Sequence, residues 1–107
     1  MQRITDANLQ ALVDRINRET GMPMKSYDVP KNDAEHAMYR GARVPQAGNY
    51  HLSWAYGGVS LHRMSLAPGC SGISDVFSCG HVKKRELYDM MHAFLRGLDA
   101  TRAAVAA

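Results

Sequence analysis

The chain has 107 residues, of which 46% are hydrophobic and 21% charged, so it can bury a core and is too apolar for wholesale disorder. Thirteen Lys and Arg against ten Asp and Glu give a formal net charge of +3, which permits contact with nucleic acid or an acidic protein surface without indicating either. The sequence contains no apolar run of about eighteen residues and no hydrophobic signal-peptide core, so we expect a cytoplasmic protein without a membrane partner.

The first predicted element is a helix over residues 6–20. Thr5 is a suitable N-cap, because its hydroxyl can accept a hydrogen bond from a first-turn amide. Apolar residues with helical spacing follow at Leu9, Leu12, Val13 and Ile16. Gly21 can adopt the left-handed conformation that ends a helix, and Pro23 prevents its continuation.

Residues 22–47 are predicted as an irregular insertion, because prolines are spread through them and no strand-like alternation persists. One short helix is indicated inside this insertion, with Asn32 or Asp33 as its cap and Gly41 at its end. A helix of this length is marginal by itself, so it would have to dock onto the rest of the protein. A docked helix and an irregular loop are both compatible with the sequence.

A β-hairpin over residues 50–64 is the strongest local pattern, because apolar and polar residues alternate on both sides of Gly57-Gly58. A two-residue turn at this dipeptide predicts the pairs Tyr56 with Val59, Trp54 with Leu61, and Leu52 with Arg63. We expect these residues to face the core. Arg63 fits that face poorly, which predicts either a bulge before Met64 or a strand that ends there.

The other face of the hairpin carries the polar residues, and we expect water to cover it. We refer to this surface as the polar face; its members are His51, Ser53, Ala55, Ser60, His62 and Met64.

Residues 73–79 are predicted as a third strand, antiparallel to the second because the connection is too short for a parallel crossover. Gly80 ends this strand. A second long helix is predicted over residues 83–98, and residues 99–107 could extend it or fray. Its apolar stripe consists of Leu87, Met90, Met91, Phe94, Leu95 and Leu98.

The order of these elements predicts an α+β fold. It is a two-layer sandwich in which a three-stranded antiparallel meander packs against the N-terminal and C-terminal helices. No repeat or linker divides the chain, so we expect residues 1–107 to form a single domain.

Catalytic and metal sites are weakly indicated. Tetrahedral zinc sites commonly contain two close pairs of ligands, and this chain has one, Cys79-Gly80-His81. Further ligands would have to come from Cys70, His51, His62 and His92. Cys79 could act as a nucleophile with a histidine base, but no pattern indicates an oxyanion site. We therefore expect buried thiols and surface histidines, with no metal, no cofactor and no enzymatic activity.

Lys83, Lys84 and Arg85 form a basic start to the last helix, which we call the basic corner. The order helix, three-stranded sheet, helix resembles the double-stranded RNA-binding domain, which places a Lys-rich start of its last helix on phosphates. The resemblance is one of topology. It implies nucleic-acid binding as an alternative function, whereas the simpler interpretation is a solvated helix start.

Several segments resemble a family of short proteins encoded by tailed phages and prophages of proteobacteria. They are residues 48–52 (GNYHL), 55–59 (AYGGV), 61–64 (LHRM), 74–82 (SDVFSCGHV) and 84–88 (KRELY), about half the chain. The resemblance implies an accessory protein that acts in the host cell by stoichiometric binding to a host protein or ribonucleoprotein complex. Its most concrete form is an anti-CRISPR-type inhibitor of a bacterial defence system. The resemblance carries over no catalytic or binding residue.

Two groups of residues are not explained by folding alone. They are the basic corner, Lys83, Lys84 and Arg85, and part of the polar face, His51, Ser53 and His62. We predict these six as the binding residues.

Overall fold

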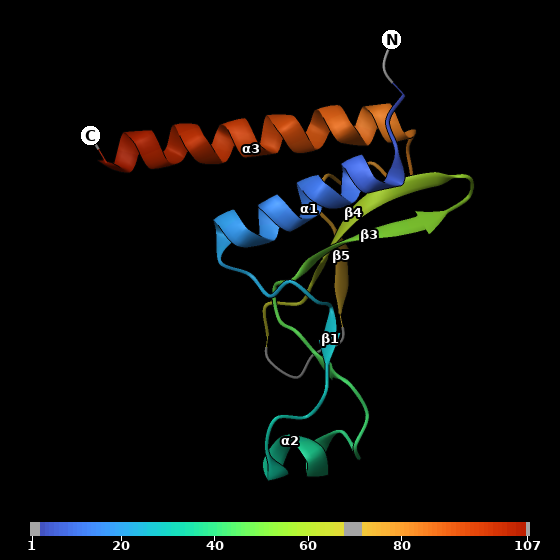
Figure 1. Cartoon of the computed structure of the whole chain (residues 1–107), viewed down its shortest axis with the longest axis vertical. Helices are drawn as coiled ribbons and strands as arrows, with labels where there is room; N and C mark the ends of the chain where they lie inside the picture. Colours follow the sequence, from blue (N-terminus) through green and yellow to red (C-terminus); the bar gives the residue numbers. More distant parts are fainter. Residues whose placement is uncertain (1–2, 68–71, 107) are drawn as a thin grey trace.

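The computed structural model describes residues 3–67 and 72–106, and Figure 1 shows how their helices and strands are arranged. Along the chain these are α1 (Asp6–Thr20), β1 (Tyr27–Asp28), α2 (Asp33–Met38), β2 (Val44–Pro45), β3 (Tyr50–Ala55), β4 (Gly58–Met64), β5 (Ile73–Asp75) and α3 (Lys84–Ala106). Strands β3, β4 and β5 form an antiparallel sheet in that order, and β1 pairs with β2 separately. The predicted α+β class with a three-stranded antiparallel sheet is therefore confirmed.

Helix α1 begins and ends at the predicted residues. The Thr5 hydroxyl accepts a hydrogen bond from the backbone amide of Asn8 at 3.1 Å, and the Asn8 side chain accepts one from the Thr5 amide at 2.9 Å. This reciprocal pair is a capping box, which satisfies two amides that the first turn leaves without helical partners. Gly21 ends the helix in the left-handed conformation, with a φ of 71°.

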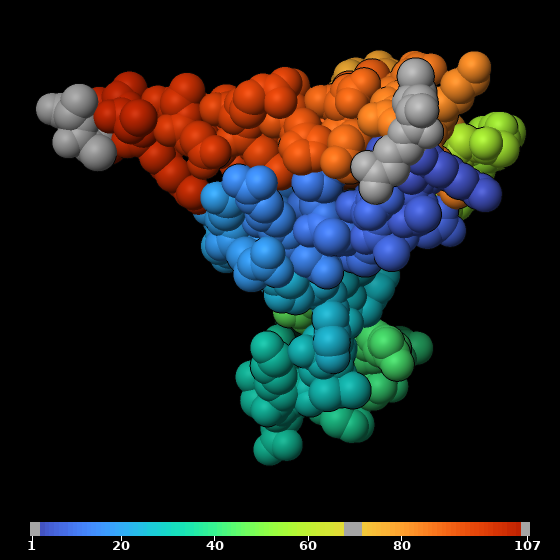
Figure 2. Space-filling view, turned by 45° about the horizontal axis from the view of Figure 1, so that its top comes forward, coloured from blue at the N-terminus to red at the C-terminus, as the bar shows by residue number. Residues whose placement is uncertain are grey.

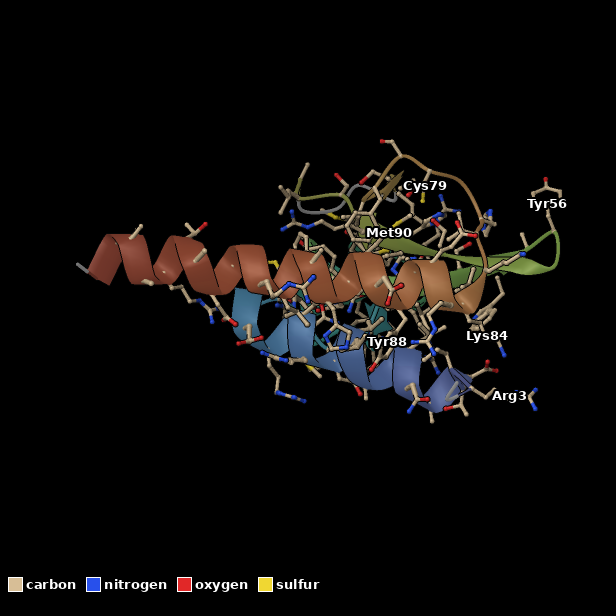
Figure 3. All side chains as sticks on the ribbon, turned by 90° about the horizontal axis from the view of Figure 1, so that it is seen from above. Arg3, Tyr56, Cys79, Lys84, Tyr88 and Met90 are labelled. Atoms are coloured by element: carbon tan, nitrogen blue, oxygen red, sulfur yellow. The ribbon has the colours of Figure 1, made fainter. Side chains whose placement is uncertain are left out.

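Helices α1 and α3 lie on one face of the sheet, α1 against β3 and α3 against β4 (Figures 1 and 3). Their apolar stripes meet the helix-facing side of the sheet and form the core. Core residues that are at most 2% exposed are Leu9, Val13, Ile16, Val59, Leu61, Leu87, Met91 and Leu95. Full burial of a side chain of this kind contributes about 1.5–3 kcal/mol, so this layer is the main source of stability.

The hairpin between β3 and β4 has a different turn from the predicted one. Tyr56 and Gly57 form it, with φ values of 55° and 74°, and Ala55 pairs with Gly58. Consequently Trp54 opposes Val59 and Leu52 opposes Leu61, so the predicted register is wrong. The reason is tertiary: a Cβ on Gly58 would lie 2.9 Å from the carbonyl oxygen of Val82.

The register change leaves each strand residue on its predicted face, but two aromatic residues expected in the core are exposed: Tyr56 in the turn, at 98%, and Trp54 next to the hairpin tip, at 48%. Arg63 pairs with Tyr50, and its guanidinium carbon lies 4.7 Å from the centre of the Tyr50 ring. Its Nε also donates to the carbonyl of Gly48 at 3.2 Å. The pairing is continuous through Arg63, so no bulge is needed, and β4 ends at Met64 as one of the two alternatives predicted.

Strand β5 is shorter than predicted and ends at Asp75. The Asp75 carboxylate accepts hydrogen bonds from the backbone amides of Phe77, at 3.3 Å, and Gly80, at 2.8 Å, which bend the chain away from the sheet. The chain returns at Val82, which exchanges two backbone hydrogen bonds with Val59. The predicted strand over residues 73–79 is therefore wrong beyond Asp75.

Residues 22–47 form a projecting arm, which Figures 1 and 2 show standing out from the layer of helices. Strands β1 and β2 pair along its length, which the sequence did not indicate. Helix α2 forms with Asn32 as its cap, since the Asn32 side chain accepts from the Glu35 amide at 2.8 Å. The short helix indicated by the sequence therefore forms, but none of its residues is buried, so α2 lies exposed on the arm and neither of the two alternatives, a docked helix or an irregular loop, describes it.

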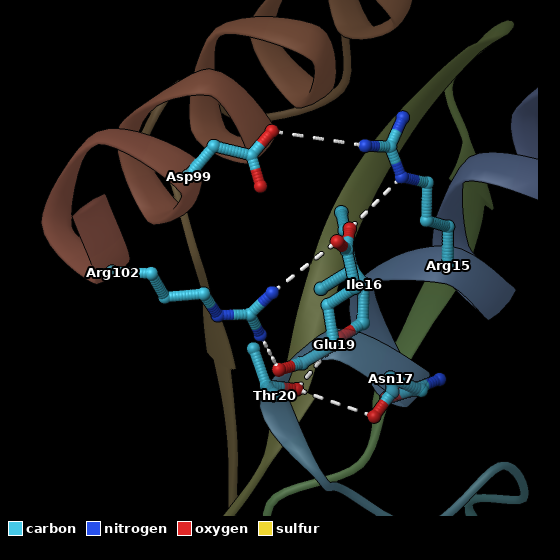
Figure 4. A network of polar contacts seen from close by, with 7 residues as sticks. All are labelled: Arg15, Ile16, Asn17, Glu19, Thr20, Asp99 and Arg102. Carbon is cyan, nitrogen blue, oxygen red and sulfur yellow. Dashed lines mark hydrogen bonds and ion pairs between the residues drawn. The ribbon is translucent and has the colours of Figure 1, made fainter. Parts of the chain in front are cut away.

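Helix α3 extends to Ala106, beyond the predicted end at residue 98. Figure 4 shows why the added turns remain helical next to the end of α1. Arg102 pairs with the carboxylate of Glu19 at 3.3 Å and also donates to the Glu19 carbonyl, while Asp99 lies 3.8 Å from Arg15. Ion pairs at an exposed position contribute about 0.2–1 kcal/mol each, which is enough to favour a helical extension that already has alanine-rich sequence.

Candidate functional site

The polar face lies on the side of the sheet that α1 and α3 leave uncovered. His51 stands directly opposite His62, and Ser53 stands opposite Ser60. The three binding residues predicted on this face, His51, Ser53 and His62, therefore lie close together. Ser60 and Met64 are buried, at 0% and 1% exposed, and the expectation of a water-covered face is therefore wrong for them.

Four aromatic rings cross this face, and we call them the ring row: His51, His62, His81 and Tyr56. Successive ring centres are 6.0, 5.8 and 5.8 Å apart. His81 is fixed in the row by its Nε2, which lies 3.1 Å from the Ser53 hydroxyl oxygen. The sequence did not identify His81 or Tyr56 as binding residues, because their places depend on the return of the chain at Val82 and on the shifted turn.

The basic corner lies at the same end of the molecule as Tyr56. Figure 3 shows Tyr56 at the hairpin tip, with Lys84 and Arg3 nearby at this end. Lys84 Nζ lies 2.7 Å from Asp6 Oδ1 and 5.8 Å from the centre of the Trp54 ring. The guanidinium of Arg85 lies 5.7 Å from the centre of the Tyr88 ring. Two of the three predicted cations, Lys84 and Arg85, therefore already contact other side chains of this protein.

Lys83 is the cation that connects the two predicted groups. It is exposed, and no ion pair within residues 3–67 and 72–106 involves it. It lines one shallow depression together with Tyr56, Gly57, Gly58, His81, Val82 and Glu86. The structure thus places the ring row and the basic corner side by side, joined through His81 and Lys83.

The charge state of the polar face follows from its surroundings. Burial and the neighbouring His62 lower the pKa of His51, so its ring is neutral at pH 7. Desolvation acts to raise the pKa of Asp75, but hydrogen bonds to its carboxylate, chiefly from the Gly80 amide, outweigh it and lower the pKa overall. The ring of His51 is therefore uncharged, and the ionised carboxylate of Asp75 lies on the other side of His62, with which both residues are paired.

The geometry does not favour the nucleophilic chemistry considered from the sequence. Desolvation and the charge of Asp75 raise the pKa of the Cys79 thiol, which keeps it protonated. Cys79 is exposed, so the expectation of a buried thiol is wrong for it, and Cys70 lies outside the described residues. Ser53 and His81 are at the distance of a nucleophile and its base. A carboxylate would have to orient the His81 ring for such a pair to act, and Asp75 instead accepts hydrogen bonds from the Phe77 and Gly80 amides.

The described cysteine and histidine residues do not assemble a metal site. Within residues 3–67 and 72–106, no three His, Cys, Asp or Glu side chains are placed to share a metal ion. The sulfur of Cys79 instead lies 3.9 Å from the sulfur of Met90.

A second exposed surface is found on the arm. Large apolar side chains point into solvent there: Met24 is 48%, Val29 62% and Met38 72% exposed. Two shallow depressions on the arm share Gln46 in their lining, one containing Met24 and the other Met38. The arm is tied to the sheet by Asn49, whose side chain donates to the Pro23 carbonyl and accepts from the Ser26 hydroxyl.

Comparisons with known proteins found no matching family model, no matching curated protein and no matching solved structure. Among the helices of the described residues, none is long and apolar enough to cross a membrane.

Proposed function

We propose that this protein binds nucleic acid at the end of the molecule where the ring row meets the basic corner. The supporting observation is that Tyr56, His81 and Lys83 line one depression. Aromatic rings bind bases by stacking, and a lysine ammonium binds phosphates as a compact cation. The small net charge of +3 is consistent with moderate affinity that depends on salt.

Fluorescence anisotropy with labelled oligonucleotides, titrated at increasing salt, tests this proposal. Lys83→Ala should weaken binding and should reduce the slope of log K against log salt by about one, because one phosphate contact is lost. Lys31→Ala is the matched control, since Lys31 is exposed on the arm away from the site, and it should leave the slope unchanged. If the protein did not change the anisotropy of any labelled oligonucleotide at low salt, the proposal would be contradicted.

The arm favours a second candidate function, which is stoichiometric binding to a host protein complex. Exposed apolar side chains on one projecting element are typical of protein interaction sites, and methionine side chains adapt to different partners. Together with the resemblance to phage and prophage proteins, this suggests an accessory protein of the host cytoplasm. An anti-CRISPR-type inhibitor is its most concrete form.

The two candidates can be separated by removing the arm. Ser26 and Gln46 are paired at its base, since the Gln46 amide donates to the Ser26 carbonyl at 2.8 Å. Replacing residues 27–45 with Asn-Gly, which favours a two-residue hairpin turn, should therefore close the chain without disturbing the sheet. Affinity capture from a bacterial lysate should recover a host complex with the complete protein and lose it with this variant. Equal recovery by both would argue against the arm.

A further inference from the structure

We infer that the ligand of this site is a single strand of nucleic acid, with one base stacked on Tyr56 and the strand continuing along the ring row. This inference rests on the nucleic-acid binding proposed above and specifies the class of ligand. It differs from the double-stranded RNA that the topological resemblance would suggest.

The position of Tyr56 is the first argument. Its side chain is 98% exposed at the tip of the hairpin, and Figure 3 shows it extending away from the body of the protein. The bases inside a duplex stack on each other, so a protein ring cannot reach their faces unless a base leaves the stack. A single strand presents those faces without this cost. The ring of Tyr56 is therefore suited to an unpaired base.

The ring row behind Tyr56 is the second argument. Its neighbouring rings meet at angles of 59–77°, so none of them is stacked flat on the next. The row lies on the face of the sheet that α1 and α3 leave uncovered, and sheets that bind single-stranded RNA present aromatic rings on such a face. His81 is held in place by Ser53 at 3.1 Å, which lowers the entropy lost when a base contacts it.

The sparse charge of the site is the third argument. Lys84 is paired with Asp6, Arg85 lies over Tyr88, and Glu86 lines the same depression as Lys83. A protein that makes about six to ten phosphate contacts on a duplex needs a comparable number of cations. Among the described residues, the basic corner and Arg3 together supply fewer than that at this end. A site that stacks bases on aromatic rings requires fewer cations, because part of the binding free energy comes from the stacked bases.

The experiment compares three labelled probes of one sequence by fluorescence anisotropy: single-stranded RNA, single-stranded DNA, and a blunt duplex. We expect the affinity for either single strand to be at least about tenfold higher than the affinity for the duplex. Tyr56→Asn should weaken single-strand binding about fivefold or more, the loss expected for one stacked base. Asparagine tolerates the left-handed backbone at this position, where φ is 55°, so the fold should persist. Tyr56→Phe keeps the ring and should restore the affinity.

The outcomes separate this inference from the proposed function. A preference for RNA or for DNA supports the inference equally and identifies the strand. Duplex binding as tight as single-strand binding would overturn the inference and leave nucleic-acid binding in place. A single-strand affinity that Tyr56→Asn does not change would also overturn it. Absence of binding to all three probes would overturn both.

Discussion

The four rings of the row have different surroundings, and these determine what each ring can do. Tyr56 is almost fully exposed and His81 is held by Ser53, whereas His51 is half-buried beside His62. A neutral ring can stack on a base or accept a hydrogen bond, and a protonated ring would attract phosphate. The burial of His51 therefore bears on both stability and binding.

We expect the free energy of unfolding to fall as the pH decreases from about 7 to 5. The pKa of His51 is held below its ordinary value of about 6.5, so the unfolded chain takes up a proton before the folded chain does. The stability that depends on a neutral His51 ring is thus complete above the pKa of His51 in the unfolded chain, and it is lost as the pH falls from there through the lower pKa in the folded chain. Urea unfolding at several pH values measures this.

His51→Gln should make that dependence on pH shallower, because it removes the group whose pKa differs between the two states. His36→Gln is the control, since His36 is exposed on α2. If His51→Gln retained the full slope, the slope would have another origin.

Gly58 shows how one missing side chain sets the position of the turn. Gly58→Ala should lower the free energy of unfolding by about 1–3 kcal/mol, because the added Cβ would lie 2.9 Å from the Val82 oxygen. Gly57→Asn is the control in the same hairpin: no atom lies within 4 Å of a Cβ there, and asparagine accepts its φ of 74°. Equal unfolding midpoints for Gly58→Ala and the native protein would contradict this account.

At the scale of elements, the two long helices are stabilised in different ways. Helix α1 has a capping box, a left-handed glycine at its end and a buried Asn17 that exchanges two hydrogen bonds with the backbone of Tyr50. Helix α3 is longer than its buried stripe, and its last turns depend on exposed ion pairs with α1. We therefore expect substitutions that change helix propensity to affect the stability of α3 more than the stability of α1.

Gly97→Ala should raise the free energy of unfolding by about 0.5–1 kcal/mol, because Gly97 lies on the exposed side of α3 and costs backbone entropy. An added Cβ would meet no atom within 4 Å. Ala93→Gly is the reverse control on the same helix and should lower it by a similar amount, as thermal unfolding followed by circular dichroism would show. A lower melting temperature for Gly97→Ala would show that the glycine serves an unrecognised contact.

At the scale of the whole molecule, the protein is a two-layer body with two projections. Its radius of gyration of 15.6 Å exceeds the value of about 13 Å expected for a compact chain of this size. The arm and the end of α3 both stand out from the body in Figure 1. This shape places the two candidate binding surfaces on separate parts of the protein.

Replacing residues 27–45 with Asn-Gly should leave the body folded, since Val44, at 5% exposed, is the one buried residue of that segment. The variant should unfold in one cooperative transition and should bind oligonucleotides as the complete protein does. Loss of cooperative unfolding would mean that the arm is required for the core to form. Loss of oligonucleotide binding alone would move the nucleic-acid site to the arm.

The sequence by itself determined the α+β class, helix α1 with both of its ends, and the face on which each hairpin residue except Tyr56 lies, and it narrowed the cap of α2 to Asn32 or Asp33. These depend on local periodicity and capping, which act within a few residues. Tertiary structure alone decided the turn at Tyr56-Gly57, the early end of β5, the exposed position of α2 and the meeting of His81 with the polar face. The turn and the place of His81 both follow from the return of Val82 to Val59, a contact between residues distant in sequence that excludes a side chain at Gly58 and that no local pattern encodes. The exposed position of α2 has a separate reason, since the arm that carries it pairs only with itself through β1 and β2.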